Sequence, residues 1–385
     1  MELNTKNITL DNKTYLLKQI NEKLFKNINN LNVNNNIIFV YTPPKVASTS
    51  IVSSLRLFLS HKFNIIHIHN EKMLSSLINM NIDSITINDI ILYNKELGKN
   101  VYVIDVFRNP VERKISEYFE QLSSLHFNNT DENLKSYSIQ KIINRFNNIY
   151  PYIANEDYFM EKYNIIIPEK FDFEKKYLLF EENGIKYIKL RMNDINSWSK
   201  ILTRIFETEI IIVNDYETKT KSIGEVYKNF KNIYKLPYNY FLLLNECPLL
   251  KYYYNDEERN NYLNIWIEKI DNSKIISFTN DEYLFYLKIS IENKFYNNYI
   301  QANHYMDNGC LCNFCSNKRK EFIKKLKKGE QINNEKINHD VDLIKKEIIE
   351  NSIKKNYSIF NNDKQKYHNQ KIKKTFNSVV FTQKS

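Results

Sequence analysis

The chain of 385 residues is 42% hydrophobic and 14% aromatic, so it is long enough to bury a large core, and its net charge is +10. Four cysteines in this length exclude a disulfide-rich scaffold. The sequence has neither a secretory apolar region at its N-terminus nor an apolar run of membrane-spanning length, which predicts a cytoplasmic or otherwise intracellular protein without a signal peptide or transmembrane segment.

The first informative segment joins a predicted strand to a predicted helix. Residues 37–41 are apolar and β-branched, and the Pro43-Pro44 pair ends this strand. The apolar residues from Ile51 onward recur at helical spacing. Hydroxyls at the start of such a helix cap free backbone N–H groups or help to bind an anion, and Lys45 adds a full positive charge. The hydroxyls here are those of Ser48, Thr49 and Ser50.

Two other interpretations of this segment stay open. One is an ordinary capped turn between a strand and a helix, although Lys45 and three adjacent hydroxyls exceed what a cap needs. A nucleotide-binding P-loop needs glycines and a Lys followed directly by Ser or Thr. Here Val46 and Ala47 separate Lys45 from Ser48, and the loop has no glycine, so the sequence disfavours a kinase or NTPase.

Residues 63–69 form the second predicted strand. His67 and His69 share one face of it, while the isoleucines beside them point to the other face. Both histidines lie toward the carboxyl end of the strand, where open α/β sheets bind ligands. The alternative is that a histidine is only packed or solvated. Glu71 follows closely and can orient an imidazole or act as a base itself.

The third predicted strand, residues 101–107, leads through Arg108 into another helix. Asn109 suits the N-cap of this helix, and Pro110 suits its first position. Arg108 can bind a phosphate bidentately, and Ser116, nearly two turns into the helix, can add a hydroxyl. The alternative is an Arg108–carboxylate pair beside an exposed Ser116. Two such corners on neighbouring strands predict a ligand with two separated phosphate-like groups.

At these two corners the chain resembles a known family. The string Pro44-Lys-Val-Ala-Ser-Thr-Ser50 resembles the 5′-phosphosulfate loop of sulfotransferases that use 3′-phosphoadenosine 5′-phosphosulfate (PAPS), in particular carbohydrate 2-O-sulfotransferases acting on uronic acids. The string from Arg108 to Ser116 resembles the 3′-phosphate motif of the same enzymes. The family usually has Asp where this chain has Asn109, and often Gly where it has Ala47.

Other segments extend the resemblance to roughly residues 35–315. The segments 158–159, 171–177 and 189–198 are similar to a capsular polysaccharide protein family that is thought to share the fold. The resemblance therefore implies a P-loop NTPase-like sulfotransferase fold, an α/β structure whose mostly parallel sheet is flanked by helices. It also implies PAPS as co-substrate, no catalytic metal, and a carbohydrate hydroxyl as acceptor.

The resemblance also assigns roles to residues. Arg108 and Ser116 would bind the 3′-phosphate, and Lys45 would also stabilise charge on the oxygen that bridges sulfur and phosphorus. A catalytic His of the family stands where this chain has His67, with His69 as the runner-up and Glu71 as the alternative base. The 5′ side of PAPS would be held by Lys45, Ala47, Ser48, Thr49 and Ser50.

Three of the four cysteines lie close together in the sequence. Cys310, Cys312 and Cys315, with His304 upstream, would satisfy a tetrahedral structural zinc. The paired C-x₂-C spacing of a zinc ribbon is missing, so reduced cysteines in a packed turn are the alternative and no metal is assigned.

The basic excess lies entirely in the last part of the chain. Residues 316–385 hold 18 Lys and Arg against 8 Asp and Glu, whereas the first 315 residues hold 37 of each. Such a tail can attract an acidic polysaccharide, nucleic acid or an anionic membrane surface, or it can be a solvated, partly helical extension. Its few aromatic residues disfavour nucleic acid, whose bases need stacking partners.

We predict an N-terminal extension (1–36), a sulfotransferase-like domain (37–315) and a Lys-rich, partly helical C-terminal tail (316–385). A fourth strand is expected at 185–191, and residues 130–180 and 225–300 are expected to be largely helical. Two rival functions stay open: a nucleotide-dependent, kinase-like enzyme, and a non-catalytic protein that binds polysaccharide or nucleic acid. The sequence carries no signal of oligomeric state.

Overall fold

The computed structural model describes residues 10–26, 36–80, 82, 84–120, 135, 138–149, 163–213, 223–273 and 313–330. The chain divides into two compact units. The sheet unit comprises residues 1–108, 156–215 and 304–335, and the helical unit comprises residues 109–155, 216–303 and 336–385. The predicted domain 37–315 contains parts of both units, and its boundaries stay a prediction.

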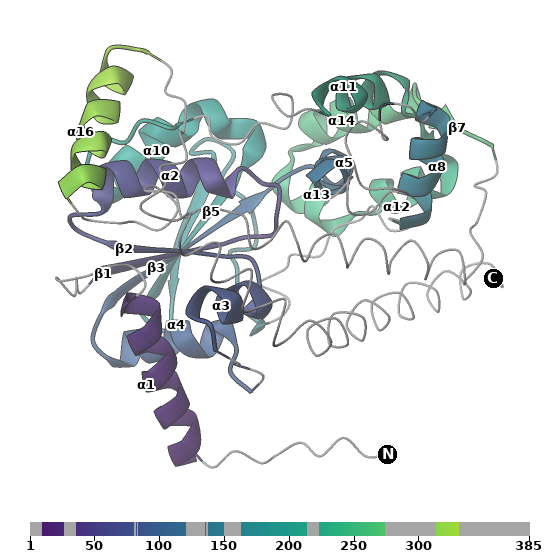
Figure 1. Ribbon diagram of the computed structural model, residues 1–385. Coiled ribbons are helices and arrows are strands. Elements are labelled where there is room, and N and C mark those ends of the chain that lie inside the picture. The colour runs from purple at the N-terminus through teal and green to yellow at the C-terminus, as the bar shows by residue number, and fades with distance from the viewer. Residues whose placement is uncertain are drawn as a thin grey trace, which may run out of the picture. The chain divides into compact units, whose positions relative to one another are not determined.

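The sheet unit is built on five strands in the order β2-β1-β3-β5-β4 (Figure 1). Neighbouring strands are parallel, except that β4 is antiparallel to β5. This confirms the predicted α/β class with a mostly parallel sheet, and it confirms the four predicted strands. The bounds are β1 (Asn36–Tyr41), β2 (Asn64–Ile68), β3 (Asn100–Phe107), β4 (Tyr177–Glu182) and β5 (Ile185–Arg191).

Helices cover both faces of this sheet. One face carries α2 (Ser48–Leu59) and α10 (Trp198–Phe206), and the opposite face carries α1 (Leu10–Lys26), α3 (Glu71–Ile78) and α4 (Ile87–Glu96) (Figure 1). Because both faces are covered, β1 and β3 are almost continuously apolar. Strand β1 lies between β2 and β3, so the strand order reverses at β1. Open α/β sheets bind ligands beside the carboxyl ends of the strands at such a point.

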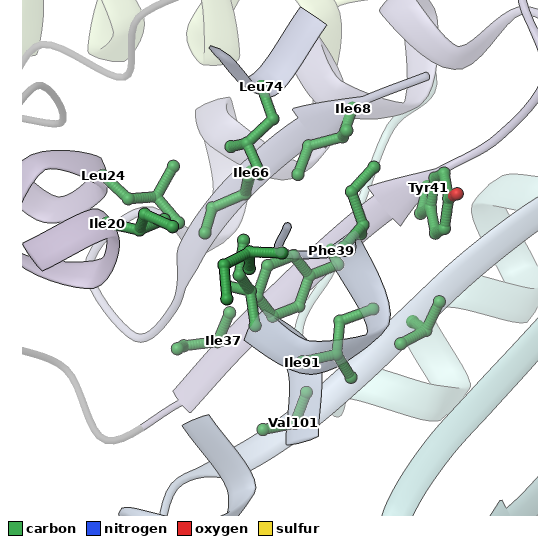
Figure 2. Close-up of a cluster of buried hydrophobic side chains, with 14 of the residues drawn as sticks. Ile20, Leu24, Ile37, Phe39, Tyr41, Ile66, Ile68, Leu74, Ile91 and Val101 are labelled. Carbon is green, nitrogen blue, oxygen red and sulfur yellow. The ribbon is translucent and has the colours of Figure 1, made fainter. Parts of the chain in front are cut away.

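Figure 2 shows the core beneath α1, α3 and α4. Alternate side chains of β1 point into this core because successive residues of a strand face opposite sides. Each of these large apolar side chains stabilises the fold by about 1.5–3 kcal/mol when it is fully buried. Helix α1, which lies in the predicted N-terminal extension, is therefore part of this core. The labelled members are Ile20, Leu24, Ile37, Phe39, Tyr41, Ile66, Ile68, Leu74, Ile91 and Val101.

Strand β4 lies where the sequence predicted helix, so that part of the prediction is wrong. Residues Asn183 and Gly184 join β4 to β5, with φ angles of 52° and 71°. Positive φ at both residues is what a two-residue type I′ hairpin turn requires, and Asn-Gly is its preferred sequence. This local turn pairs β4 with β5, and β4 is the outermost strand on this side of the sheet.

The helical unit confirms the helical prediction for residues 225–267. Its elements are α5 (Pro110–Glu120), α8 (Ile139–Ile149), α11 (Gly224–Ile233), β6 (Leu236–Pro237), α12 (Tyr238–Asn245), α13 (Pro248–Tyr253), α14 (Asp256–Ile267) and β7 (Ile270–Asp271). Its core is aromatic, with ring centroids 5.0 to 5.5 Å apart. The rings belong to Tyr118, Phe119, Phe146, Phe230 and Tyr234.

Helix α16 (Asn313–Lys327) brings part of the predicted basic tail onto the sheet unit. It packs against α2 (Figure 1), and its Phe322 is buried. Lys327 also forms an ion pair with Glu209. The tail is therefore partly helical, as predicted, and its residues from 331 onward lie outside the described part of the chain.

Candidate functional site

The loop between β1 and α2 has an unusual backbone. Lys45 and Ala47 have φ angles of 68° and 61°, in the left-handed region that residues with a Cβ rarely adopt. Ala47 is the N-cap residue of α2 and makes no side-chain capping bond. The three predicted hydroxyls, those of Ser48, Thr49 and Ser50, therefore occupy the first turn of the helix, as expected, and none of them is the N-cap.

Arg108 lies at the carboxyl end of β3 and contacts this loop. Its Nη1 donates a hydrogen bond to the Lys45 carbonyl oxygen at 2.6 Å, and both side chains are half-buried. Strands β1 and β3 are direct neighbours, so their carboxyl ends meet at one edge of the sheet. The structure thus brings together the two cationic segments that the sequence singled out. The bond uses one of the five N–H donors of the guanidinium.

His67 faces the start of α2. Its Nε2 lies 3.0 Å from the Ser48 hydroxyl oxygen, and the ring is half-buried. Burial, the neighbouring His69 ring and the Arg56 guanidinium hold the pKa of His67 well below its ordinary value of 6.5, because each disfavours the charged form. His67 is therefore a neutral imidazole at pH 7.

His69 lies just beyond β2, at the same edge. Its Nδ1 lies 2.8 Å from the Thr42 carbonyl oxygen. A carbonyl can only accept, so Nδ1 of the imidazole carries the proton and donates it. The His67 and His69 rings meet edge to face, with centroids 4.6 Å apart. The two predicted histidines are thus brought together.

Glu71 begins α3, two residues after His69. Its Oε1 accepts hydrogen bonds from the Tyr163 hydroxyl at 2.7 Å and from the backbone N–H of Ile87 at 3.4 Å. The neighbouring Asn70 is the N-cap and accepts from the backbone N–H of Met73. Glu71 therefore joins α3 to the start of α4 and to Tyr163.

Ser116 belongs to the helical unit, where it is buried in α5. The predicted helix start is confirmed: α5 begins at Pro110, and the Asn109 carbonyl accepts from the Arg113 N–H at 2.9 Å. The Asn109 side chain accepts from the Tyr254 hydroxyl instead of capping the helix. That Ser116 and Arg108 bind one phosphate stays a prediction.

The segments 171–177 and 189–198, which resemble the capsular polysaccharide family, meet at the end of β5. The Arg191 guanidinium lies 4.9 Å from the Phe171 ring centroid, and its Nε donates to Asp194 at 2.6 Å. The Trp198 indole N–H donates to the Arg191 carbonyl at 3.0 Å. The four side chains are buried and contact one another or nearby backbone, so packing within the sheet unit explains why these residues lie together.

The structure adds one residue that the sequence did not indicate. Thr42 is fully buried and follows β1 directly, and its backbone carbonyl orients His69. A backbone carbonyl has no sequence signature, so only the three-dimensional structure could identify it.

The proposed zinc ligands stay a prediction. Cys310, Cys312 and His304 lie outside the described residues, and of Cys315 only the backbone of α16 is described. Within the described ranges, no cluster of three His, Cys, Asp or Glu side chains is arranged to hold a metal ion.

No protein-family model matches the chain, and neither a curated protein nor a solved structure shows significant similarity to it. None of the helices in the described ranges combines the length and the apolar character needed to cross a bilayer.

Proposed function

We propose that the protein transfers the sulfuryl group of PAPS to a hydroxyl of a carbohydrate. The observation that carries this proposal is the meeting of two cationic segments, in which the Arg108 guanidinium donates to the Lys45 carbonyl at 2.6 Å. They meet at the carboxyl ends of β1 and β3, next to the start of α2. A Lys, an Arg and a helix start together suit a ligand that carries several anionic groups.

The proposed roles follow from this arrangement. Lys45 would neutralise the charge that builds on the bridging oxygen as the bond between sulfur and that oxygen breaks. Ser48 and its neighbours in the first turn of α2 would hold the 5′-phosphate, and Arg108 would hold the 3′-phosphate. As in phosphoryl transfer, most of the catalysis would come from positioning and charge neutralisation.

A proton acceptor beside the loop supports the same reaction. The low pKa of His67, caused mainly by burial, keeps an uncharged imidazole at this edge at neutral pH. An uncharged imidazole is the form that can take the proton of an attacking hydroxyl, and His67 and His69 are the two candidates for this general base. His69 lies in contact with His67, and Glu71 follows His69 by two residues.

The rival functions make different demands. A kinase would need a glycine-containing loop and a hydroxyl directly after the Lys to hold magnesium, and the loop of residues 42–47 supplies neither. A non-catalytic polyanion-binding protein would depend on its basic tail and not on Lys45.

Transfer of a radioactive sulfur label from PAPS to a de-sulfated, uronic-acid-containing polysaccharide tests the proposal. We expect labelled polysaccharide with the wild type and a rate lowered by about 10²-fold or more for Lys45→Ala, because an electrostatic contact to the developing charge is lost. Lys200→Ala, at an exposed position of α10, is the matched control and should keep the wild-type rate. Label transfer that is equal in the Lys45→Ala variant and the wild type would contradict the proposed role of the loop.

A further inference from the structure

The two histidines at the sheet edge are held by different nitrogens. His69 uses Nδ1, which lies 2.8 Å from the Thr42 carbonyl oxygen. His67 uses Nε2, which lies 3.0 Å from the Ser48 hydroxyl. The two ring nitrogens of an imidazole do different work, because the hydrogen bond at one nitrogen decides the state of the other. This difference separates the roles of the two residues.

The bond to Thr42 fixes the tautomer of His69. The carbonyl oxygen only accepts, so the neutral ring must carry its proton on Nδ1 and its lone pair on Nε2. The acceptor is part of the main chain and fully buried, next to the end of β1, where the Thr42 N–H itself donates to the Ile68 carbonyl. The orientation of the His69 ring is therefore set by backbone that the sheet holds in place.

The bond to Ser48 engages the nitrogen that His67 would need as a base. Whether His67 donates or accepts in this bond, its Nε2 and the Ser48 hydroxyl position each other. Ser48 is buried and opens α2, the helix whose first turn follows the Lys45 loop. The imidazole of His67 thus braces the start of the helix that is proposed to hold the donor.

We propose that His69 is the general base through Nε2, and that His67 is a positioning residue that holds Ser48 and the first turn of α2. This inference rests on the proposed sulfuryl transfer. In the transfer step a lone pair of the acceptor oxygen forms a bond to sulfur, and the bond from sulfur to the bridging phosphate oxygen breaks. Its electron pair stays on 3′-phosphoadenosine 5′-phosphate (PAP), and the hydroxyl proton moves to Nε2 of His69. The products are the sulfate ester, PAP and an imidazolium that later releases its proton to water.

The contact between the two rings is compatible with a base at His69 and a positioning role for His67. Their centroids are 4.6 Å apart, so a charge on one ring disfavours a charge on the other. His67 stays neutral because burial, His69 and Arg56 lower its pKa. Protonation of His69 during the reaction therefore meets an uncharged neighbour.

Two substitutions separate the roles because amide side chains imitate one ring nitrogen each. In His69→Asn the amide nitrogen replaces Nδ1 and keeps the donation to Thr42, but no group replaces Nε2. In His67→Gln the amide nitrogen stands near the place of Nε2 and keeps a partner for Ser48. His61→Asn, at an exposed position after α2, is the control.

We expect His69→Asn to lower kcat for label transfer from PAPS to the de-sulfated polysaccharide by about 10²–10⁴-fold, with little change in the KM for PAPS. The acidic limb of its pH profile should also disappear. His67→Ala should mainly raise the KM for PAPS, and His67→Gln should recover most of that loss. The opposite pattern, in which His67→Gln loses kcat and His69→Asn keeps it, would overturn the inference while leaving sulfuryl transfer intact.

A second measurement does not depend on the acceptor. Nuclear magnetic resonance of the full chain with ¹⁵N-labelled imidazoles, saturated with PAP, reports which nitrogen of each ring carries the proton. We expect the Nδ1–H tautomer for His69, assigned by its absence in His69→Asn. An Nε2–H tautomer would overturn the inference. A wild type that neither binds PAP nor transfers label would refute the proposed function itself.

Discussion

The environment of His67 penalises its protonated form. The ring is half-buried, and its pKa lies well below 6.5 because of burial, the nearby His69 and Arg56. In the unfolded chain the same group takes up a proton near pH 6.5. Between the two pKa values the unfolded state binds more protons than the folded state, so the free energy of unfolding falls as the pH falls through this range.

We therefore predict that His67→Gln makes stability less dependent on pH. One such group contributes at most about 1.4 kcal/mol per pH unit below pH 6.5. Urea denaturation at pH 7.5, 6.5 and 5.5 should show the wild type losing more stability toward low pH than His67→Gln. The pKa of the exposed His61 is lowered less strongly, so His61→Gln should change the slope less. Parallel curves for the wild type and His67→Gln would contradict the assigned environment.

Ala47 carries backbone strain at the start of α2. A residue with a Cβ at a φ of 61° loses about 1 kcal/mol relative to its favoured conformations, whereas glycine does not. We predict that Ala47→Gly is neutral or stabilises the fold by up to about 1 kcal/mol, and that Ala47→Val destabilises it by more than about 1 kcal/mol. Urea denaturation of both variants measures this. If Ala47→Gly lowers the free energy of unfolding by about 1 kcal/mol, as glycine does at ordinary helical positions, the backbone at Ala47 is not strained.

At the scale of elements, a buried ion pair joins the central strand β3 to its neighbour β5. Asp105 and Lys189 are register partners, and their side chains are 4% and 2% exposed. Because the charges are removed from water, each depends on the other for its stability. Asp105 also accepts from the Val106 N–H at 2.7 Å.

We predict that Lys189→Met alone costs about 3–5 kcal/mol, since it leaves the Asp105 carboxylate buried without its cation. The double variant Asp105→Val/Lys189→Met should recover most of this loss, because an apolar pair of similar volume packs between the same strands. A double-mutant cycle by urea denaturation measures the coupling. If the stability lost in the double variant equals the sum of the losses in the two single variants, the pair does not interact as the structure indicates.

The elements that the sequence predicts best are those with strong local signals. Strand β1 is a run of apolar, β-branched residues that ends at two prolines, and α2 has apolar residues at helical spacing. Strand β4 is not among the predicted strands, although Asn183-Gly184 is a strong hairpin signal, because residues 177–180 fall in the stretch 130–180 that is expected to be largely helical. The sequence predicts a partly helical tail, but the packing of α16 on α2 is a tertiary contact that it does not predict.

For the candidate site too, some features are predictable from the sequence and others are not. The chemistry of Lys45, Arg108 and His67 is visible in the sequence as charged or titratable side chains at strand ends. The contacts that give these residues their roles are not visible. Thr42 acts through a backbone carbonyl, and Arg108 donates to the backbone of Lys45. Main-chain partners of this kind carry no residue preference, so sequence reasoning could not supply them.

At the scale of the whole molecule, the sheet unit holds the loop, both histidines and Arg108, while Ser116 lies in the helical unit. The sheet unit also carries α16, in which Lys320 and Lys324 are exposed, and the exposed Lys328 follows the helix directly. The proposed donor site and the basic helix are separate features of this unit, because no residue of α16 is part of the loop. They can therefore be tested independently.

We predict that the triple variant Lys320→Glu/Lys324→Glu/Lys328→Glu keeps its affinity for PAP within about twofold at 0.15 M salt, where exposed charges are screened beyond about 8 Å. Its binding to an acidic polysaccharide should weaken if the tail attracts polyanions. Isothermal titration calorimetry with PAP, beside a polysaccharide pull-down, measures both. A large loss of PAP affinity would mean that the basic helix, and not the loop, binds the nucleotide.

The most direct test of the central claim is a calorimetric titration with PAP, beside ATP with magnesium, on the wild type and Arg108→Ala. We predict that the wild type binds PAP and prefers it to ATP with magnesium. Arg108→Ala should weaken PAP binding by about 10- to 150-fold, because a hydrogen bond to a charged group contributes about 1.5–3 kcal/mol. Arg204→Ala, an exposed arginine of α10, should bind as the wild type does. Preference for ATP with magnesium, or PAP binding that is unchanged in Arg108→Ala, would contradict the account.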